Sequence, residues 1–314
     1  MKAIPVRHWG RWLAVAIILF LIAAMIYSVA RNPRFDWPTI GQYLFNSYIL
    51  GGVVVTLELT VIAMAIGIVG GTLIAIMRLS KNPILSAVAQ AYIWVFRGTP
   101  LLVQLYFWFF FGALYPYIFV GLPFTHISFL SLDSGTLIGA FMAGVLGLGF
   151  NEIAYASELV RAGIISVDKG QLEASQSLGM SGPMTLRRIV LPQAMRVIIP
   201  PMGNETISML KTTSLVSVIS GTDLMSRARY IYDANLKVIP LLVVVSIWYL
   251  ALTTIFSIGQ HYLERHYSRG SGYHTPKKRN GAWGRRWPLR SNEIEVTEEV
   301  EELGLEIELG RDHR

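Results

Sequence analysis

The sequence contains no cysteine, which excludes a disulfide framework, a thiol nucleophile and a thiolate metal site. It also lacks the phosphate-binding pattern GxxxxGK[S/T], the zinc motif HExxH and the nucleophile motif GxSxG. The six histidines are scattered along the chain. None of the common enzyme motifs is therefore present, and the chain has no recognisable ATP site of its own.

Charge is also scarce: 15% of the residues are charged and 53% are hydrophobic, with a mean hydropathy of +0.48. Soluble domains carry about 25% charged residues, so this is the composition of an integral membrane protein. The net charge of +7 does not come from the last part of the chain, because nine basic and nine acidic residues balance from Ser268 onward. The excess lies beside the apolar segments, which favours a role in membrane orientation over nucleic-acid binding.

Six apolar stretches are long enough to cross a bilayer, for which a helix needs about 20 residues. They cover 12–30, 52–77, 87–115, 135–159, 197–219 and 238–262, and Gly98-Thr99-Pro100 interrupts the third. The first follows a basic N-terminus, as a signal peptide would, but it is long and no small-residue cleavage site precedes a soluble domain. We expect a retained anchor. The predicted fold class is therefore an all-α integral membrane protein with six transmembrane helices.

Basic residues divide unequally between the two sides of these spans. With the N-terminus inside, the inside segments contain Lys2, Arg7, Arg11, Arg78, Lys81, Arg161, Lys169, Arg187, Arg188 and Arg196. The outside segments contain only Arg31, Arg34, Arg227, Arg229 and Lys237. Because positive residues concentrate in the cytoplasm, both termini and residues 173–192 are predicted to be cytoplasmic.

Residues 173–192, EASQSLGMSGPMTLRRIVLP, form the longest polar, charge-bearing interruption between two apolar blocks. A short helix is expected over 173–178, with Glu173 in its first turn, where the helix dipole favours a carboxylate. Gly179 stands where a left-handed cap requires a residue without Cβ. A second short helix is expected over 184–190, and Pro192 is expected to end it. Such a compact helix–turn–helix indicates a surface that a partner holds.

The spacing of this segment resembles the EAA loop of type I ABC importer permeases. The matching residues are Glu173, Ala174, Ser175, Gly179, Ile189, Leu191 and Pro192, with Ser175 in place of the second alanine. Three further segments are similar to the polar amino-acid branch of that family: FRGTPLLVQ at 96–104, AYxxExxRAG at 154–163 and KTTSL at 211–215. Together the segments follow the family's order and span about residues 50 to 260.

This resemblance implies a permease subunit of an importer for polar amino acids, among them histidine, glutamate, glutamine, arginine and opines. It implies no cofactor on this chain, because ATP and Mg²⁺ would be bound by separate ABC ATPase subunits that contact the EAA-type loop. The other implied partners are a second permease chain, identical or different, an extracytoplasmic solute-binding protein, a small polar amino-acid substrate and the lipid bilayer of the cell membrane. Two alternatives remain: an importer of another small polar solute, such as an opine, and a secondary carrier or channel without an ATPase.

Charged and polar residues inside predicted spans are candidates for the solute path, because placing them in a bilayer is costly. The candidates are Glu58, Arg97, Asn204, Glu205, Lys211 and Thr212. Asn204, Ser208 and Lys211 or Thr212 recur at helical spacing and so share one face. Glu58 and Lys211 are expected to be deeply buried. A zwitterionic solute would need acceptors for its ammonium group and a cation for its carboxylate.

Each candidate also has a purely structural interpretation. Arg97 is expected near the inner end of its span, where it could extend to the interface and cap the preceding segment. Glu158 could pair with Arg161 one turn away, and Glu152 could bind the backbone of a neighbouring helix. Glu205 could satisfy amides freed at Pro200-Pro201, and the hydroxyls of 212–214 could bond to carbonyls of their own helix.

The sequence predicts three parts. Residues 1–47 contain a cytoplasmic segment, an accessory helix and an external loop, and residues 48–263 form a five-helix type I permease domain. Residues 264–314 are a cytoplasmic tail, whose basic-aromatic stretch and acidic run predict disorder. A membrane-surface role for 277–290 is the alternative for the tail.

Overall fold

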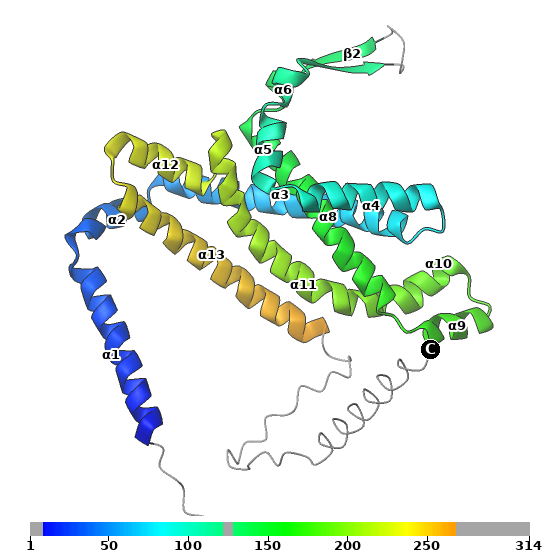
Figure 1. Cartoon of the computed structure of the whole chain (residues 1–314), viewed down its shortest axis with the longest axis horizontal. Coiled ribbons are helices and arrows are strands. Elements are labelled where there is room, and N and C mark those ends of the chain that lie inside the picture. The colour runs from blue at the N-terminus through cyan, green and yellow to red at the C-terminus, as the bar shows by residue number, and fades with distance from the viewer. Residues whose placement is uncertain (1–8, 122–127, 268–314) are drawn as a thin grey trace, which may run out of the picture. The chain divides into compact units, whose positions relative to one another are not determined.

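The computed structural model describes residues 9–121 and 128–267, and these are helical apart from one hairpin and short connections (Figure 1). Within the described ranges, three helices are long and apolar enough to cross a membrane: Gly10–Arg31, Ser47–Leu79 and Val238–Tyr267. They correspond to α1 (Trp9–Arg31), α3 (Ser47–Arg78) and α13 (Val238–Tyr267). The first, second and sixth predicted spans are thus found as single helices.

Helix α1, which the sequence predicts to be an accessory anchor, buries none of its most apolar 18 residues against the described chain. The predicted tail is almost wholly outside the described residues, and α13 continues to Tyr267, past the predicted start of the tail at 264.

The third predicted span is two helices, α4 (Pro83–Gly98) and α5 (Leu101–Phe109), separated as expected at Thr99-Pro100. The Gln104 amide donates to the carbonyls of Phe96 (3.0 Å) and Thr99 (3.2 Å), and Asn151 donates to the Phe96 carbonyl at 3.0 Å. These bonds satisfy carbonyls that the break leaves without helical partners. Arg97 lies in the last turn of α4, directly before this break.

The fourth and fifth predicted spans are α8 (Ala140–Ile165) and α11 (Leu191–Thr212), which the 3₁₀ segment η3 (Thr213–Ile219) continues. Pro200 and Pro201 lie inside α11 rather than near its start, and Gln260 of α13 donates to the Pro200 carbonyl at 3.3 Å. Figure 1 shows α8 beside α3, and α11 beside both α8 and α13.

Close contact between α3 and α8 depends on Gly67 and Gly71. A Cβ atom on Gly71 would lie 2.7 Å from the Ala156 methyl group, and one on Gly67 would lie 2.2 Å from Cγ of Glu152. Neither position has room for a side chain, so the two helices pack backbone to side chain here. One buried hydrophobic cluster contains Leu59 of α3, Leu105 of α5 and Leu148 of α8.

The connections between the long helices contain short elements of their own. Residues 31–47, where a loop was predicted, contain η1 (Pro33–Phe35) and α2 (Trp37–Leu44), and the strands β1 (Tyr117–Gly121) and β2 (Ser128–Asp133) pair antiparallel. The short helices α6 (Phe111–Leu114) and α7 (Ser134–Leu137) flank these strands. Helix α12 (Leu224–Asn235) precedes α13 and packs against α3.

Lys237, at the start of α13, joins this helix to the η1–α2 connection. Its ammonium group bonds to Oδ2 of Asp36 at 2.8 Å and to Oγ1 of Thr39 at 2.7 Å. The hydrogen bonds from Lys237 and Thr39 lower the pKa of Asp36 below its usual 3.8. A lowered pKa means that the pair contributes stability above the unfolded pKa and loses it as the pH falls through the folded value.

We expect Lys237→Met to cause a small fall in the melting temperature of the purified protein. The fall should be equal at pH 8 and pH 5.5, because Asp36 is ionised at both values. Thermal scans of the wild type and the variant at the two pH values test this. An effect present at pH 8 and absent at pH 5.5 would contradict the assigned pair.

Candidate functional site

The predicted helix–Gly–helix element is present and begins earlier than expected. Its first helix, α9, covers Lys169–Ser177, and the Asp168 side chain caps it by accepting from the Gly170 amide at 2.8 Å. Glu173 is therefore not in the first turn, and the predicted interaction of its carboxylate with the helix dipole is wrong, since that effect fades beyond the first turn. Glu173 remains exposed and open to contact from outside.

Gly179 has the predicted left-handed conformation, with φ of +71°. Its amide donates to the Gln176 carbonyl at 2.9 Å, and the Met180 amide donates to the Ser175 carbonyl at 3.0 Å. This pair of bonds is a Schellman motif, which ends α9 and turns the chain sharply. Nothing lies within 4 Å of a Cβ built on Gly179, so a substitution there strains the backbone without disturbing packing inside the chain.

A buried hydroxyl pair joins α9 to α10 (Gly182–Thr185). Oγ1 of Thr185 lies 3.1 Å from Oγ of Ser175, and Ser175 donates in turn to the Leu172 carbonyl at 2.7 Å. Both side chains are buried. Ser175, which stands where the family pattern has alanine, thus takes part in fixing the angle between the two short helices.

A double-mutant cycle on Ser175→Ala and Thr185→Val measures this contact. We expect each single variant to lower the free energy of unfolding by about 1 kcal/mol, with a coupling energy of similar size. Chemical denaturation of the four purified proteins would give these values. Strictly additive effects would show that the hydroxyl pair contributes nothing to the element.

The chain continues without a break from α10 through the π-helical segment η2 (Leu186–Val190) into α11. The prediction that Pro192 ends a helix is therefore wrong. The Leu191 amide donates to the Leu186 carbonyl, five residues back, and this wider turn precedes Pro192 in the first turn of α11. A proline at that position sacrifices no helical hydrogen bond, so it begins α11 instead of ending its predecessor.

Most residues of the EAA-type pattern lie on the surface. Glu173, Ala174, Gly179, Leu191 and Pro192 are exposed. Ile189 is half-buried and Ser175 is buried.

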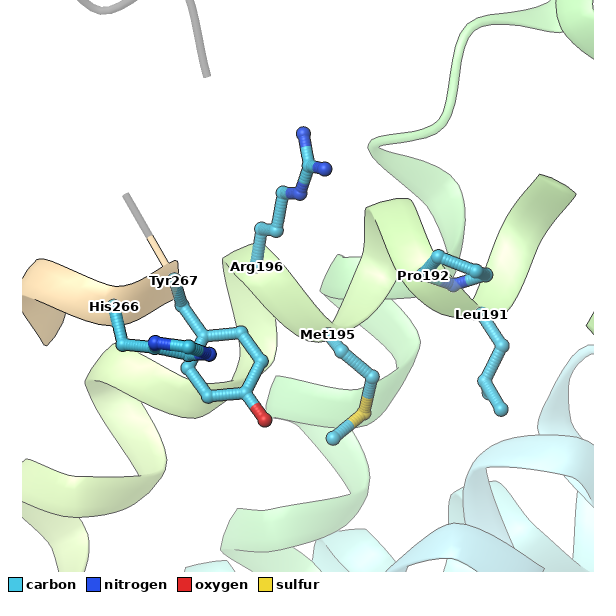
Figure 2. A pocket seen from close by; sticks show the side chains of 6 residues that line it. All are labelled: Leu191, Pro192, Met195, Arg196, His266 and Tyr267. Carbon is cyan, nitrogen blue, oxygen red and sulfur yellow. The ribbon is translucent and has the colours of Figure 1, made fainter. Parts of the chain in front are cut away.

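Two grooves adjoin these residues. One, of about 350 Å³, is lined by apolar side chains of α8, α9 and η2, among them Leu172 and Leu186. The other, of about 390 Å³, lies between Leu191, Pro192, Met195 and Arg196 of α11 and His266 and Tyr267 of α13 (Figure 2).

An ion cluster links α3 to α8 near this element. Glu158 pairs with Arg161 on its own helix at 2.9 Å, as one interpretation of the sequence predicted, and its second carboxylate oxygen pairs with Arg78. All three side chains are mostly buried. The cluster therefore holds the ends of two packed helices together, and it does not contain any of the predicted path residues.

The predicted path residues do not form one buried site. Glu58 and Lys211 are exposed on this chain, so their predicted deep burial is wrong: each helix turns these side chains away from the chain's own core. Arg97 is also exposed, with its guanidinium 5.1 Å from the centre of the Tyr155 ring. Glu205 is half-buried. The four exposed members of the set face a surface that another chain, lipid or a solute could cover: Glu58, Arg97, Asn204 and Lys211.

Glu152 is the most deeply buried carboxylate of α8, at 2% exposure. Its Oε1 atom has no hydrogen-bond partner in the described part of the chain. The interpretation that Glu152 binds a neighbouring backbone is therefore wrong for this oxygen.

Asn204, Ser208 and Lys211 do share one face, as predicted, and they line a groove of about 410 Å³. Ser257, Gln260, His261 and Glu264 of α13 line the same groove. Thr212 does not line this groove. Its hydroxyl donates to the Ser208 carbonyl at 2.9 Å, which matches the structural interpretation of that residue. We call this space the α11–α13 groove.

Gln260 connects the two sides of the α11–α13 groove. Its amide nitrogen lies 2.8 Å from Oδ1 of Asn204 and 2.8 Å from Oε1 of Glu264. The sequence analysis did not select any α13 residue, although Ser257, Gln260, His261 and Glu264 recur at helical spacing in an otherwise apolar segment. This polar periodicity could have identified the α13 residues as candidates. Glu264 was not considered because the predicted sixth span ended at 262.

Residues 67–269 match the family described as binding-protein-dependent transport system inner membrane component. The match covers more than half of the chain, and the chain belongs to this family. It contains α3 from Gly67 onward, the helix–Gly–helix element, and the helices that line the α11–α13 groove.

Among its relatives is the arginine transport system permease protein ArgU of Corynebacterium glutamicum, 47% identical over 86% of this chain and 84% of that protein. The probable glutamine ABC transporter permease protein GlnM of Bacillus subtilis is 34% identical over 70% of this chain and 93% of that protein.

Solved structures agree on the fold. A chain from the crystal structure of an amino acid ABC transporter with histidines superposes with a TM-score of 0.59 at 36% identity, over 70% of this chain and 94% of that chain. A chain of the MetNI methionine ABC transporter superposes with a TM-score of 0.53 at 18% identity, over 70% and 95%. The all-α, type I ABC permease fold that the sequence predicted is confirmed.

Proposed function

We propose that this chain is the permease subunit of an ATP-driven importer that carries a polar amino acid across the cell membrane. The observation that carries the proposal is the 47% identity to an arginine permease protein over most of both chains. The helix–Gly–helix element supports coupling to an ATPase subunit, because it offers that subunit an exposed surface of fixed shape. An importer of an opine-like solute remains the alternative within the same class.

ATP hydrolysis belongs, in this proposal, to separate ABC ATPase subunits that bind ATP and Mg²⁺. They would contact Glu173, Ala174, Gly179 and the exposed start of α11 at Leu191 and Pro192. The family description supports a binding protein as a further partner, since it names binding-protein-dependent transport. A second permease chain, identical or not, would cover the outward-facing polar residues of this one.

The proposed topology places both termini and the helix–Gly–helix element in the cytoplasm. The distribution of basic residues supports it. The proposed division of the chain is an accessory part at 1–47, a permease domain from 48 to the end of α13 at Tyr267, and a tail after it. The family match at 67–269 supports the middle part.

The solute path would follow Glu58, Arg97, Asn204, Glu205, Lys211 and Thr212. Their support is physical: charged and polar groups on spanning helices need a water-filled passage or a partner, and four of the six are exposed on this chain. Of these, Asn204 and Lys211 already line one groove.

Copurification tests the proposal at low cost. An affinity-tagged chain, solubilised in mild detergent, should bring down a subunit with the GxxxxGK[S/T] pattern in stoichiometric amount. Transport of amino acids by the isolated chain, driven by an ion gradient without any ATPase, would instead establish a secondary carrier.

A further inference from the structure

A groove of about 390 Å³ lies where α11 begins and α13 ends (Figure 2). We call it the helix-end groove, and it combines apolar and polar surfaces. Leu191 and Met195 contribute apolar side chains from α11. The polar side chains are hydrogen-bond donors: the Arg196 guanidinium, the His266 imidazole and the Tyr267 hydroxyl. This combination fits an amphipathic ligand with a hydrogen-bond acceptor at one end.

The helix-end groove has a positive electrostatic character. Arg196 carries a permanent charge, and Arg265 lies beside His266 in the last turn of α13. Among the described residues that line this groove, none is acidic. Glu264 of α13 instead lines the α11–α13 groove, where it accepts a hydrogen bond from Gln260. The acceptor end of a ligand here should therefore be an anion.

The helix-end groove also lies at the level of a membrane boundary. Arg196 directly precedes the predicted fifth span at 197–219, and His266 comes four residues after the predicted sixth span at 238–262. Four helical residues rise about 6 Å. The headgroup layer on each side of the hydrocarbon core is also about 6 Å thick. In the proposed topology both side chains thus reach the cytoplasmic headgroup layer.

An exposed apolar stripe on α13 leads to this groove. Ile255, Ile258 and Tyr262 are 63%, 55% and 67% exposed. They recur with His266 at intervals of three and four residues, so the four side chains share one face of the helix. Ile258 and Tyr262 also line a groove of about 600 Å³ on this helix. An acyl chain along this stripe would bring the headgroup joined to it to His266.

We propose that the helix-end groove binds the phosphate headgroup of an anionic phospholipid, whose acyl chain lies along Ile255, Ile258 and Tyr262. The guanidinium, imidazole and phenol groups of the groove donate to the phosphate oxygens, and the acyl chain covers the apolar stripe. This inference uses the proposed topology and holds whichever solute the chain carries.

Lipid binding to the full-length chain, purified in mild detergent with its copurifying subunits, tests the proposal. Native mass spectrometry would give the Kd of the first bound molecule for three probes. These are phosphatidylglycerol, phosphatidylcholine, which has a phosphate but no net charge, and glycerol phosphate, which has no acyl chains. The wild type should bind phosphatidylglycerol at least about fivefold more tightly than phosphatidylcholine, as one basic residue near the headgroup predicts. Glycerol phosphate should not bind at concentrations that saturate the site with phosphatidylglycerol, because it lacks the apolar contribution.

Two variants separate the headgroup from the acyl chain, and both replace exposed side chains. Arg196→Gln should weaken phosphatidylglycerol binding about fivefold and leave phosphatidylcholine binding unchanged. Tyr262→Ser should weaken both lipids equally and keep the preference between them. Lys81→Gln is the matched control, because it removes an exposed basic residue between α3 and α4 that does not line this groove. It should leave both affinities unchanged.

Several outcomes would overturn the proposal. Equal binding of the two lipids by the wild type would do so whether or not any variant folds. A preference that survives in Arg196→Gln, or that falls equally in Lys81→Gln, would show diffuse attraction to basic residues instead of a site. Glycerol phosphate binding as tight as that of the lipid would assign the groove to a soluble phosphate. Loss of the ATPase from Arg196→Gln with unchanged lipid affinity would assign it to the ATPase contact.

Discussion

Replacing Gly179 by valine should release the ATPase subunit or uncouple ATP hydrolysis from uptake. Gly179 has φ of +71°, a conformation that costs other residues about 1–2 kcal/mol and is worst for β-branched side chains. The added side chain would meet nothing within the chain, so the core should stay intact while the turn between α9 and α10 is distorted. Copurification with the ATPase and solute-stimulated hydrolysis are the two measurements.

Gly179→Asn is the matched control for this substitution. Asparagine tolerates the left-handed conformation, so it should retain most of the ATPase binding that valine loses. Loss in both variants would indicate a steric conflict with the partner instead of a need for the turn. Full coupling in Gly179→Val would show that this element is not the docking site.

Charge reversal at Glu58 or Lys211 should abolish uptake while membrane insertion and ATPase association persist. Both side chains are exposed on this chain, so their substitution does not disturb its packed core. If they line the solute path, reversing either charge repels the group that it should attract. Uptake of labelled amino acid in cells and ATPase copurification from their membranes measure the two effects separately.

The neutral variants Glu58→Gln and Lys211→Met supply the control for those reversals. Each should reduce uptake less than the reversed charge does, because it removes an attraction without adding a repulsion. Normal uptake in Glu58→Lys and Lys211→Glu would show that neither residue lines the solute path.

The turn at Gly179 could be predicted because its signal is local: one glycine after a short polar helix is enough to specify a left-handed cap. The ends of the neighbouring helices were less predictable. Asp168 and Lys169 extend α9 toward its N-terminus, and the π-helical turn before Pro192 carries the chain straight into α11. A proline signals a helix end only when it does not fall in the first turn of the next helix.

The burial of Glu58 and Lys211 could not be predicted, because hydropathy places a residue in a span but not on a face of it. The contact between Asn204 and Gln260 joins residues 56 positions apart and depends on how α11 packs against α13. The sequence analysis did not predict the paired strands β1 and β2 for a related reason: both strands are short, and what defines them is their pairing with each other.

ATP-driven uptake in proteoliposomes tests the central claim most directly. Vesicles would contain this chain with its copurifying ATPase, with the solute-binding protein and labelled arginine or glutamine outside and ATP with Mg²⁺ inside. We predict accumulation that requires ATP, the binding protein and an intact Gly179. Accumulation without ATP, or none for any amino acid while the complex hydrolyses ATP in response to a different solute, would contradict the account.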